Sequence, residues 1–347
     1  MKAAVLEQAN RLNVREVPTP QCPPDGLLLR VDGCALSAAD IRAIRHGGEG
    51  VVLPVVPGRE VVATIVEVGR NVRGYYDSQR VTFGPCLPCG RCHFCRRGQS
   101  TVCEDSLTVG ADCDGGLAEY LAMPSGAARQ ALLNRVPDGV DTAAAVLAHS
   151  LACCINAQDM VGVGLGDSVL VIGCGPMGCL HAMLARARGA TMIAMADASP
   201  ERLKLAEAAG ADRYVSETGD ALRDRVWGCT ARRGVDVVIV ASSSPEALRD
   251  ALGTVASRGR VSLVPEGEVA AGVAQADMAR VRSLELTLAG GRGAAAHQNY
   301  AALQLIRSGQ VDAERIITHR FRLDRVGQAV DVAESPSALK VLVEPGT

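Results

Sequence analysis

The chain has 347 residues, of which 48% are hydrophobic and 21% are charged, and its formal net charge is −2 at pH 7. This length leaves room for two domains with sizeable cores. The small net charge gives no electrostatic basis for binding nucleic acid or an anionic membrane. No apolar run approaches the ~20 residues that cross a bilayer. Residues 1–7 do not resemble a signal peptide, and thirteen cysteines without an export signal indicate reduced thiols or metal ligands. We therefore predict a cytoplasmic protein that binds a small molecule, and neither nucleic acid nor membrane.

The first part of the chain is rich in short β-type segments. Val-, Leu- and Ile-rich stretches at 27–31, 61–68 and 80–83 alternate with turns that contain Gly, Pro and Asp. We interpret residues 1–155 as one β-rich domain.

A cysteine-rich lobe interrupts this domain at about residues 86–104. Cys89, Cys92, Cys95 and Cys103 follow the spacing Cys-x2-Cys-x2-Cys-x7-Cys. Four soft thiolates in one short lobe suit a closed tetrahedral Zn²⁺ site, which leaves no position open for a substrate. We therefore predict one structural Zn²⁺. Cys86 lies one Cys-x2-Cys step upstream, either as a bystander or as a substitute ligand.

From about residue 156, strands alternate with helices, which indicates a parallel sheet built from βαβ units. The fold class is therefore α/β, with a doubly wound Rossmann domain at 156–293. We expect strands at 169–172, 192–196, 235–241 and 260–264, and helices at 179–188, 200–209 and 245–255. A helix at 300–308, a polar stretch at 316–323, a helix at 326–333 and a strand at 340–343 follow.

The first strand of this domain runs into a Gly-x-Gly-x-x-Gly turn that opens a helix. Gly173 permits the tight turn, Gly175 lets the backbone approach a pyrophosphate, and Gly178 lets the helix pack close to the strand. Pro176 and Met177 complete the predicted cofactor-binding turn, and the helix N-terminus offers unpaired N–H groups to the phosphates. The turn therefore predicts a dinucleotide site.

The β-rich domain, its four-cysteine lobe, the Rossmann pattern and the terminal Lys-Val-Leu-Val together resemble the zinc-containing medium-chain alcohol, polyol and threonine dehydrogenases. Further local matches are Pro57-Gly58-x-Glu60, Val66–Gly69, Gly115–Tyr120 and Ile317–His319. The resemblance implies a GroES-like catalytic domain that residues 294–347 rejoin. It also implies an active site in the cleft beside a central Rossmann domain, and a homodimer or homotetramer.

The motifs that bind catalytic zinc in this family are altered. Ser37 stands where the family has a zinc-binding cysteine, and Ala39 stands where it has the hydroxyl of a proton relay. Arg59 replaces the zinc-binding histidine of a Gly-His-Glu motif, and His149 replaces a glutamate at or near the metal. A serine hydroxyl is a poor zinc ligand, and a guanidinium has no lone pair to donate and repels Zn²⁺. We therefore predict that the catalytic zinc is absent.

Other residues must then perform the chemistry. Arg59 either polarises a substrate oxygen, or binds a carboxylate or phosphate, or forms a structural salt bridge with Asp40 or Glu60. His149 is either the proton donor, because unperturbed imidazole titrates near ~6.5, or a packing residue. Ser37 bonds either substrate or nearby backbone. His181 has no convincing partner in the sequence and is left as a surface or packing residue.

The second strand ends at Asp197, which would accept hydrogen bonds from a ribose 2′-hydroxyl and repel a 2′-phosphate. Arg202 could accommodate that phosphate, but it also fits the Asp-x-x-x-x-Arg spacing of NAD-linked relatives. We therefore predict NAD(H) as the cofactor.

The resulting functional hypothesis is an NAD(H)-dependent oxidoreductase that transfers hydride to or from a small polar substrate without catalytic zinc. Three alternatives stay open. The first is a conventional zinc-dependent alcohol or polyol dehydrogenase, the second is a lyase or epimerase that retains NAD, and the third is a non-catalytic NAD-binding protein.

Overall fold

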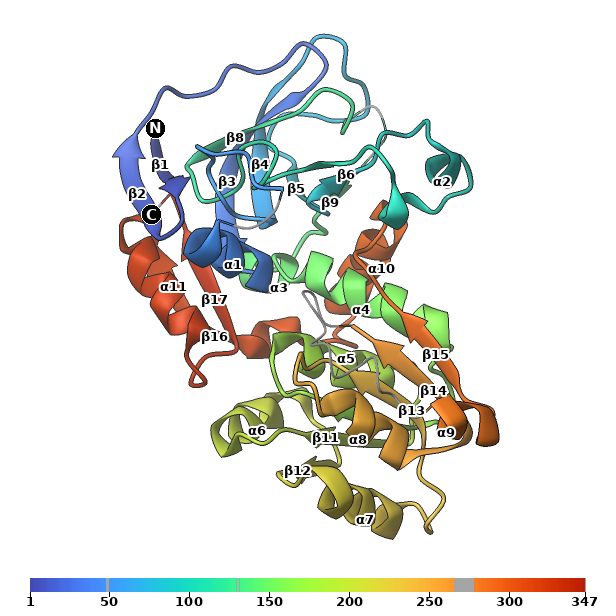
Figure 1. The fold of residues 1–347 in the computed structure, drawn as a ribbon. Helices are drawn as coiled ribbons and strands as arrows, with labels where there is room; N and C mark the ends of the chain where they lie inside the picture. Colours follow the sequence, from blue (N-terminus) through green and yellow to red (C-terminus); the bar gives the residue numbers. More distant parts are fainter. Residues whose placement is uncertain (48–49, 129, 131, 265–277, 347) are drawn as a thin grey trace. The chain divides into compact units, whose positions relative to one another are not determined.

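The computed structural model describes residues 1–47, 50–128, 130, 132–264 and 278–346, which form two compact units (Figure 1). The first unit contains residues 1–152, 293–308 and 317–347, and the second contains 153–292 and 309–316. The sequence-based bounds differ most at 309–316, which we expected in the first unit. This segment includes the 3₁₀ helix η4 (Ala313–Ile316), which packs against helical elements of the second unit. Its residues Ala313 and Ile316 are fully buried.

The first unit is built around a sheet of strand order β16-β17-β3-β4-β5-β9. The N-terminal half of β3 also pairs with β8, and its C-terminal end pairs with β17. The strands are β1 (Lys2–Gln8), β2 (Arg11–Glu16), β3 (Leu27–Ala35), β4 (Glu60–Val68), β5 (Arg80–Phe83), β6 (Cys86–Leu87), β7 (Leu107–Thr108), β8 (Tyr120–Met123), β9 (Leu133–Arg135), β16 (Ile317–Arg322) and β17 (Lys340–Glu344). The helical elements are α1 (Ala38–His46), α2 (His93–Arg96), η1 (Ser100–Val102), α3 (Thr142–Ala145), α10 (Ala296–Arg307), η5 (Leu323–Arg325) and α11 (Val326–Glu334).

The largely buried central strands supply the core of the first unit. In β3, Leu27, Leu29 and Val31 are buried and belong to one apolar cluster with Phe83 of β5. Burial of such side chains supplies most of the stabilisation of a sheet of this kind. The helix α11 packs against β16 and β17 and adds its apolar face to the same cluster (Figure 1).

The second unit has the predicted doubly wound architecture. Its strands are all parallel and follow the order β12-β11-β10-β13-β14-β15. They are β10 (Ser168–Ile172), β11 (Met192–Ala196), β12 (Arg213–Val215), β13 (Val235–Val240), β14 (Val255–Leu263) and β15 (Thr287–Gly290). The helical elements are α5 (Pro176–Ala187), α6 (Pro200–Ala206), η2 (Glu207–Ala209), α7 (Gly219–Cys229), α8 (Ala247–Thr254) and α9 (Met278–Ser283). The α/β fold class is therefore confirmed.

One helical stretch, Thr142–Val161, is long and apolar enough to cross a membrane by length and composition alone. It runs through α3 and α4 (Ala148–Val161), and 72% of its most apolar window is buried inside the protein. Polar residues such as Ser150 and Gln158 interrupt it, so the sequence has no long uninterrupted apolar run there. Such burial is characteristic of a core helix.

Candidate active site

The first part of the candidate site is the N-terminus of α1, where Ser37 and Asp40 form a capping box. The backbone N–H of Asp40 donates to Ser37 Oγ at 3.1 Å, and the backbone N–H of Ser37 donates to Asp40 Oδ2 at 3.0 Å. Ser37 Oγ also donates to Asp40 Oδ2 at 2.6 Å. Ser37 is therefore committed to its own helix, which agrees with the backbone-bonding alternative from the sequence.

Asp40 joins this cap to a buried ion pair. Its Oδ1 accepts from Arg59 Nη1 at 2.7 Å and from the backbone N–H of Gly58 at 3.1 Å. Asp40 is 0% and Arg59 8% exposed. Four hydrogen bonds thus saturate the carboxylate, which is how a buried charge is stabilised. Of the two acids that the sequence offered to Arg59, the structure selects Asp40.

Glu60 has a different partner, which the sequence analysis missed. Lys340 Nζ donates to Glu60 Oε1 at 2.7 Å, and Ser150 Oγ donates to the same oxygen at 2.7 Å. Glu60 begins β4 and Lys340 begins β17, and both strands pair with the end of β3 at Ala35 or beside it. A signal existed in the sequence, because a lysine at the start of a buried apolar strand requires an anionic partner.

His149 lies in the first turn of α4, next to Ser150. The residue is only partly buried, but its Nδ1 atom is fully buried. Burial, together with the positive charge of Lys340, lowers the pKa of His149 to about 4. The imidazole is therefore neutral at pH 7, and the expected pKa near ~6.5, on which its role as proton donor depended, does not apply.

The glycine turn lies in the second unit and agrees with the geometry that a pyrophosphate needs. Gly173 has φ +107°, and a Cβ there would lie 2.8 Å from the carbonyl carbon of Ala241. A Cβ on Gly178 would lie 1.9 Å from the carbonyl oxygen of Gly173, whereas a Cβ on Gly175 would meet no atom within 4 Å. Gly175 therefore leaves open space at the N-terminus of α5, where phosphate oxygens can approach backbone N–H groups.

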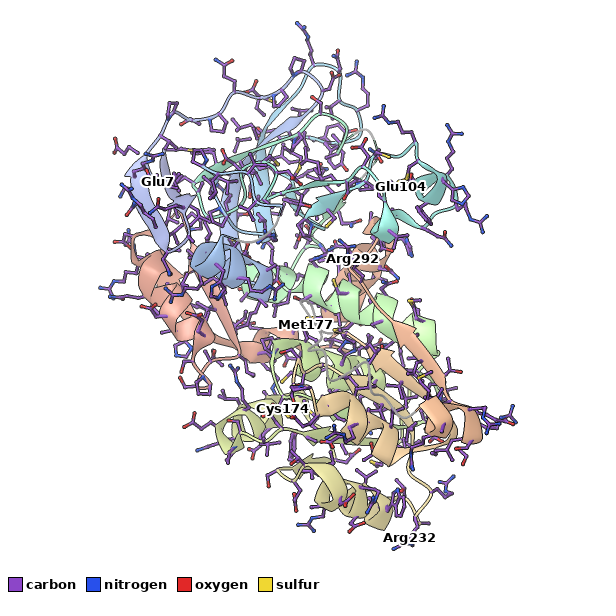
Figure 2. All side chains as sticks on the ribbon, viewed as in Figure 1. Glu7, Glu104, Cys174, Met177, Arg232 and Arg292 are labelled. Carbon is purple, nitrogen blue, oxygen red and sulfur yellow. The ribbon has the colours of Figure 1, made fainter. Side chains whose placement is uncertain are left out.

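The other predicted cofactor residues surround this turn. Pro176 and Met177 form the first turn of α5, and Figure 2 labels Met177 and Cys174. Asp197, at the end of β11, accepts from the backbone N–H of Cys174 at 2.8 Å and from that of Ser199 at 2.9 Å. Burial raises the pKa of the Cys179 thiol, in the helix that the turn opens, and the nearby positive charge of Arg202 opposes this rise. The structure thus brings all predicted cofactor residues together in one unit.

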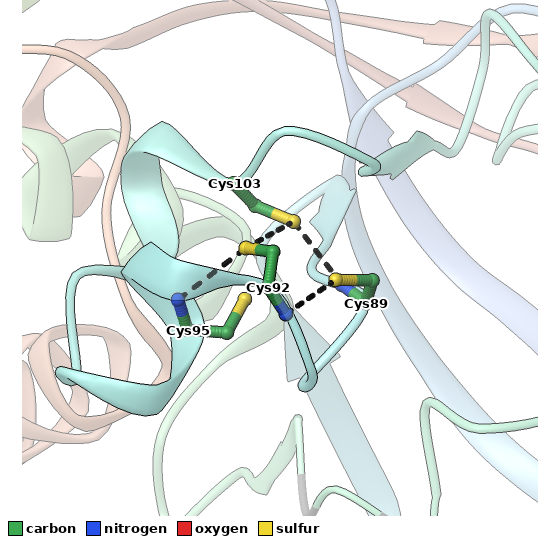
Figure 3. A group of neighbouring side chains, drawn as sticks. All are labelled: Cys89, Cys92, Cys95 and Cys103. Atoms are coloured by element: carbon green, nitrogen blue, oxygen red, sulfur yellow. Dashed lines mark hydrogen bonds between the residues drawn. The ribbon is translucent and has the colours of Figure 1, made fainter.

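The four cysteines of the lobe form a ready-made metal site. The Sγ atoms of Cys89, Cys92, Cys95 and Cys103 all lie within 4.8 Å of one another, and the side chains converge on a common centre (Figure 3). Backbone N–H groups donate to Cys89 Sγ and Cys92 Sγ and lower the pKa of both thiols. Four thiol sulfurs that converge in this way fit a closed structural Zn²⁺ site.

The donor set at the expected position of the catalytic zinc does not fit that metal. Ser37 Oγ is bonded twice to Asp40, and Arg59 presents a guanidinium that has no lone pair. Within the described ranges, the four-cysteine cluster is the sole group of three or more His, Cys, Asp or Glu side chains close enough to hold a metal ion. Cys86 lies outside this group.

Comparisons with known proteins agree with this architecture. The chain matches the model of the alcohol dehydrogenase GroES-like domain over residues 23–138 and that of the zinc-binding dehydrogenases over 176–308. It is 29% identical to an L-threonine 3-dehydrogenase of Mesorhizobium japonicum, over 99% of this chain and 98% of that relative. It is also 29% identical to a sorbitol dehydrogenase of Halalkalibacterium halodurans, over 99% of each. A structure from Sinorhizobium meliloti, described as a zinc-binding dehydrogenase bound to NADP, shares 29% identity and a TM-score of 0.89 over 99% of both chains.

Proposed function

Because the chain belongs to the zinc-type medium-chain dehydrogenase/reductase superfamily and is a nicotinamide-dependent enzyme of that type, we propose that it transfers hydride to or from a small polar substrate without a catalytic zinc ion. The bound nicotinamide supplies or accepts the hydride. The zinc of the four-cysteine lobe is structural in this proposal.

The observation that carries the proposal is the buried pair of Asp40 and Arg59, whose charged atoms lie 2.7 Å apart. Arg59 stands where the family has a zinc-binding histidine, and its positive charge would oppose a metal ion at close range. Ser37, at the position of the zinc-binding cysteine, is occupied by its capping bonds. The site therefore has a fixed guanidinium in place of the metal.

Arg59 can perform part of the task of a metal. In the described part of the chain its side chain makes one hydrogen bond, through Nη1, so Nε and Nη2 retain donors for a ligand. Donors held rigidly near a carbonyl oxygen stabilise the negative charge that develops there during hydride transfer. Asp40 offsets the charge of Arg59, which favours polarisation of a carbonyl oxygen over the binding of a full carboxylate or phosphate.

Metal analysis tests the absence of the catalytic zinc. The purified protein should contain about one zinc per chain, and Glu60→Gln and His149→Gln should leave that value unchanged. A content of about two per chain that falls to one in either variant would establish the conventional zinc dehydrogenase instead.

Cofactor turnover tests the reaction class with sorbitol and L-threonine, the substrates named for two relatives, as first probes. Net formation of NADH from NAD⁺ supports the oxidoreductase. Conversion of a probe without net NADH supports a lyase or epimerase that retains NAD. Tight binding of NADH with no conversion in either direction supports a non-catalytic protein.

The preference for NAD(H) rests on Asp197, whose carboxylate is fixed by two backbone N–H groups beside the glycine turn. A fixed carboxylate accepts from a ribose 2′-hydroxyl and repels a 2′-phosphate. Fluorescence titration should therefore show tighter binding of NADH than of NADPH, and Asp197→Ser should reduce the difference. Equal affinities in the wild-type protein would contradict the preference, and the NADP-bound relative makes this comparison necessary.

We also propose a cytoplasmic homodimer or homotetramer with a small-molecule substrate and no nucleic-acid or membrane partner. The reduced cysteines support the cytoplasmic location, the small net charge supports the lack of a nucleic-acid or membrane partner, and only the resemblance to the family supports the oligomer. Light scattering coupled to size-exclusion chromatography measures the oligomeric state, and a monomeric mass would contradict the proposal.

A further inference from the structure

The Glu60 carboxyl group differs from that of Asp40 in how its oxygens are used. Its Oε1 atom accepts from Lys340 Nζ and Ser150 Oγ, each at 2.7 Å. Its Oε2 atom is buried and has no hydrogen-bond partner among the residues that the structure describes. A buried carboxyl oxygen without a donor is costly in the ionised state. One side of Glu60 is thus held firmly, and the other is left for a proton or a ligand.

The cation beside Glu60 is an unusual choice for this chain. Lysine occurs at only three positions, 2, 204 and 340, whereas arginine supplies nearly all other positive charges. Lys2 and Lys204 are exposed, and Lys340 is 5% exposed. An ammonium is a compact point charge that fits beside one carboxylate oxygen, whereas the guanidinium fork of arginine tends to engage both oxygens. A lysine therefore pairs with Oε1 and leaves Oε2 unbound.

The groups around Glu60 shift its pKa in opposite directions. Burial raises the pKa of Glu60, as does the nearby charge of Asp40, while Lys340 and Ser150 lower it. The titratable and charged groups around Glu60 are Cys34 on β3, Asp40 on α1, Arg59 next to Glu60 in the chain, His149 on α4 and Lys340 on β17. Of these, Cys34 and His149 are neutral at pH 7, because burial raises the pKa of that thiol and lowers the pKa of that imidazole.

We propose that Glu60 exchanges the proton of the substrate oxygen through Oε2, and that Lys340 is the positioning residue that holds Glu60 by Oε1 for this exchange. The inference rests on the proposed oxidoreductase function. It replaces His149 as the proton donor and gives a role to a residue that lies 280 positions from its partner in the chain.

The proton balance of the step is simple. In reduction, the carbonyl carbon would receive the hydride of the reduced nicotinamide, while its oxygen, polarised by Arg59, takes the proton from Oε2 of the neutral Glu60 carboxyl group. The products are an alcohol and a Glu60 carboxylate, which Lys340 and Ser150 stabilise. Water that takes the place of the departed alcohol returns the proton to Oε2. In oxidation, the Glu60 carboxylate removes the hydroxyl proton while the hydride of the carbon that bears this hydroxyl would pass to the oxidised nicotinamide.

The pH dependence of the oxidation tests the inference. The value of kcat/KM should rise with pH as Glu60 loses its proton. Lys340→Met removes the charge that lowers the pKa of Glu60. The rising limb of the plot of kcat/KM against pH should therefore move to higher pH by at least about one unit. Lys340→Arg keeps the charge and should return the limb to its original pH, but kcat/KM should stay below the wild-type value because the guanidinium fork also engages Oε2. Lys2→Met, which removes an exposed lysine, serves as the control and should leave the profile unchanged.

Three substrate-independent measurements accompany the profile. The zinc content and the affinity for NADH should be the same in all variants, because neither site includes Lys340. Infrared titration of the NADH-bound enzyme should show a protonated carboxyl band that Glu60→Gln removes and that persists to higher pH in Lys340→Met. If this band is missing, or does not respond to Lys340→Met, the inference is wrong even if no substrate is found.

The outcomes separate the inference from the proposed function. Probe turnover with NAD⁺ whose pH limb is the same in Lys340→Met and the wild type overturns the inference and leaves the oxidoreductase standing. A wild-type enzyme that forms no NADH, yet converts a probe, overturns the proposed function and the proton step with it. A limb that moves in Lys340→Met and returns in Lys340→Arg supports both.

Discussion

At the scale of single residues, Asp40 is the residue that holds both Ser37 and Arg59. It caps α1, fixes Ser37 and neutralises Arg59. Asp40→Asn keeps the shape of the side chain but leaves a buried guanidinium without its counter-ion, which should cost about 3–5 kcal/mol of unfolding free energy. Ser37→Ala removes the helix cap and one of the four hydrogen bonds to Asp40 but keeps the ion pair, so it should cost less, about 1–2 kcal/mol. Urea unfolding followed by circular dichroism measures both, and equal losses would show that the ion pair contributes little.

Residue-level prediction from the sequence succeeded where the chemistry was local and failed where it was distant. The sequence indicated that Arg59 would pair with Asp40 or Glu60, but the choice depends on the turn at Gly58, whose backbone N–H also points to Asp40. Lys340 could not be assigned to Glu60, because only the pairing of β17 and β4 with β3 brings the two together. His149 was read with an unperturbed pKa, since its burial becomes visible only in the fold.

At the scale of elements, the zinc lobe offers a prediction with a matched control. Cys92→Ser removes one of four converging thiols, so the zinc content should fall from about one per chain to well below one. Hydrogen exchange should then become faster in α2 and η1, since the metal stabilises these short helices. Cys86→Ser changes a cysteine outside the cluster and should leave both measurements unchanged. Zinc loss in Cys86→Ser would instead identify it as a ligand.

The elements themselves could be predicted where hydrophobic periodicity was strong. The strands β10, β11 and β13 consist of buried apolar runs, and their predicted positions match the structure within a residue. The polar stretch at 316–323 forms β16, which the sequence analysis did not recognise as a strand. It lies at the edge of its sheet and has no fully buried residue, so its sequence lacks the apolar signal of an internal strand.

At the scale of the whole molecule, two histidines with lowered pKa values contribute to how stability responds to mild acid. His149 lies in the first unit and His181 in the second, where Gln158 donates to the carbonyl oxygen of His181 at 2.8 Å and contacts its Nδ1 at 3.3 Å. Burial lowers the pKa of His149 to about 4 and that of His181 to about 3. Below about pH 6.5 the unfolded chain therefore binds protons that the folded chain does not, and stability falls as the pH falls.

The size of this effect leads to a test on His181. Each of the two histidines should remove about 1.4 kcal/mol of unfolding free energy per pH unit below about 6.5. Each should therefore remove about 2 kcal/mol in all by about pH 5. His181→Gln eliminates one of the two groups and should flatten the pH dependence, although the variant starts from a lower stability. The exposed His46 provides the control, and His46→Gln should keep the wild-type dependence. Urea unfolding at about pH 7.5 and about pH 5 gives the two values for each protein.

Because Glu60 has a raised pKa and shifts the balance in the opposite direction, only the difference between the two variants isolates His181. Equal losses in His181→Gln and His46→Gln would mean that His181 accepts a proton in the folded state.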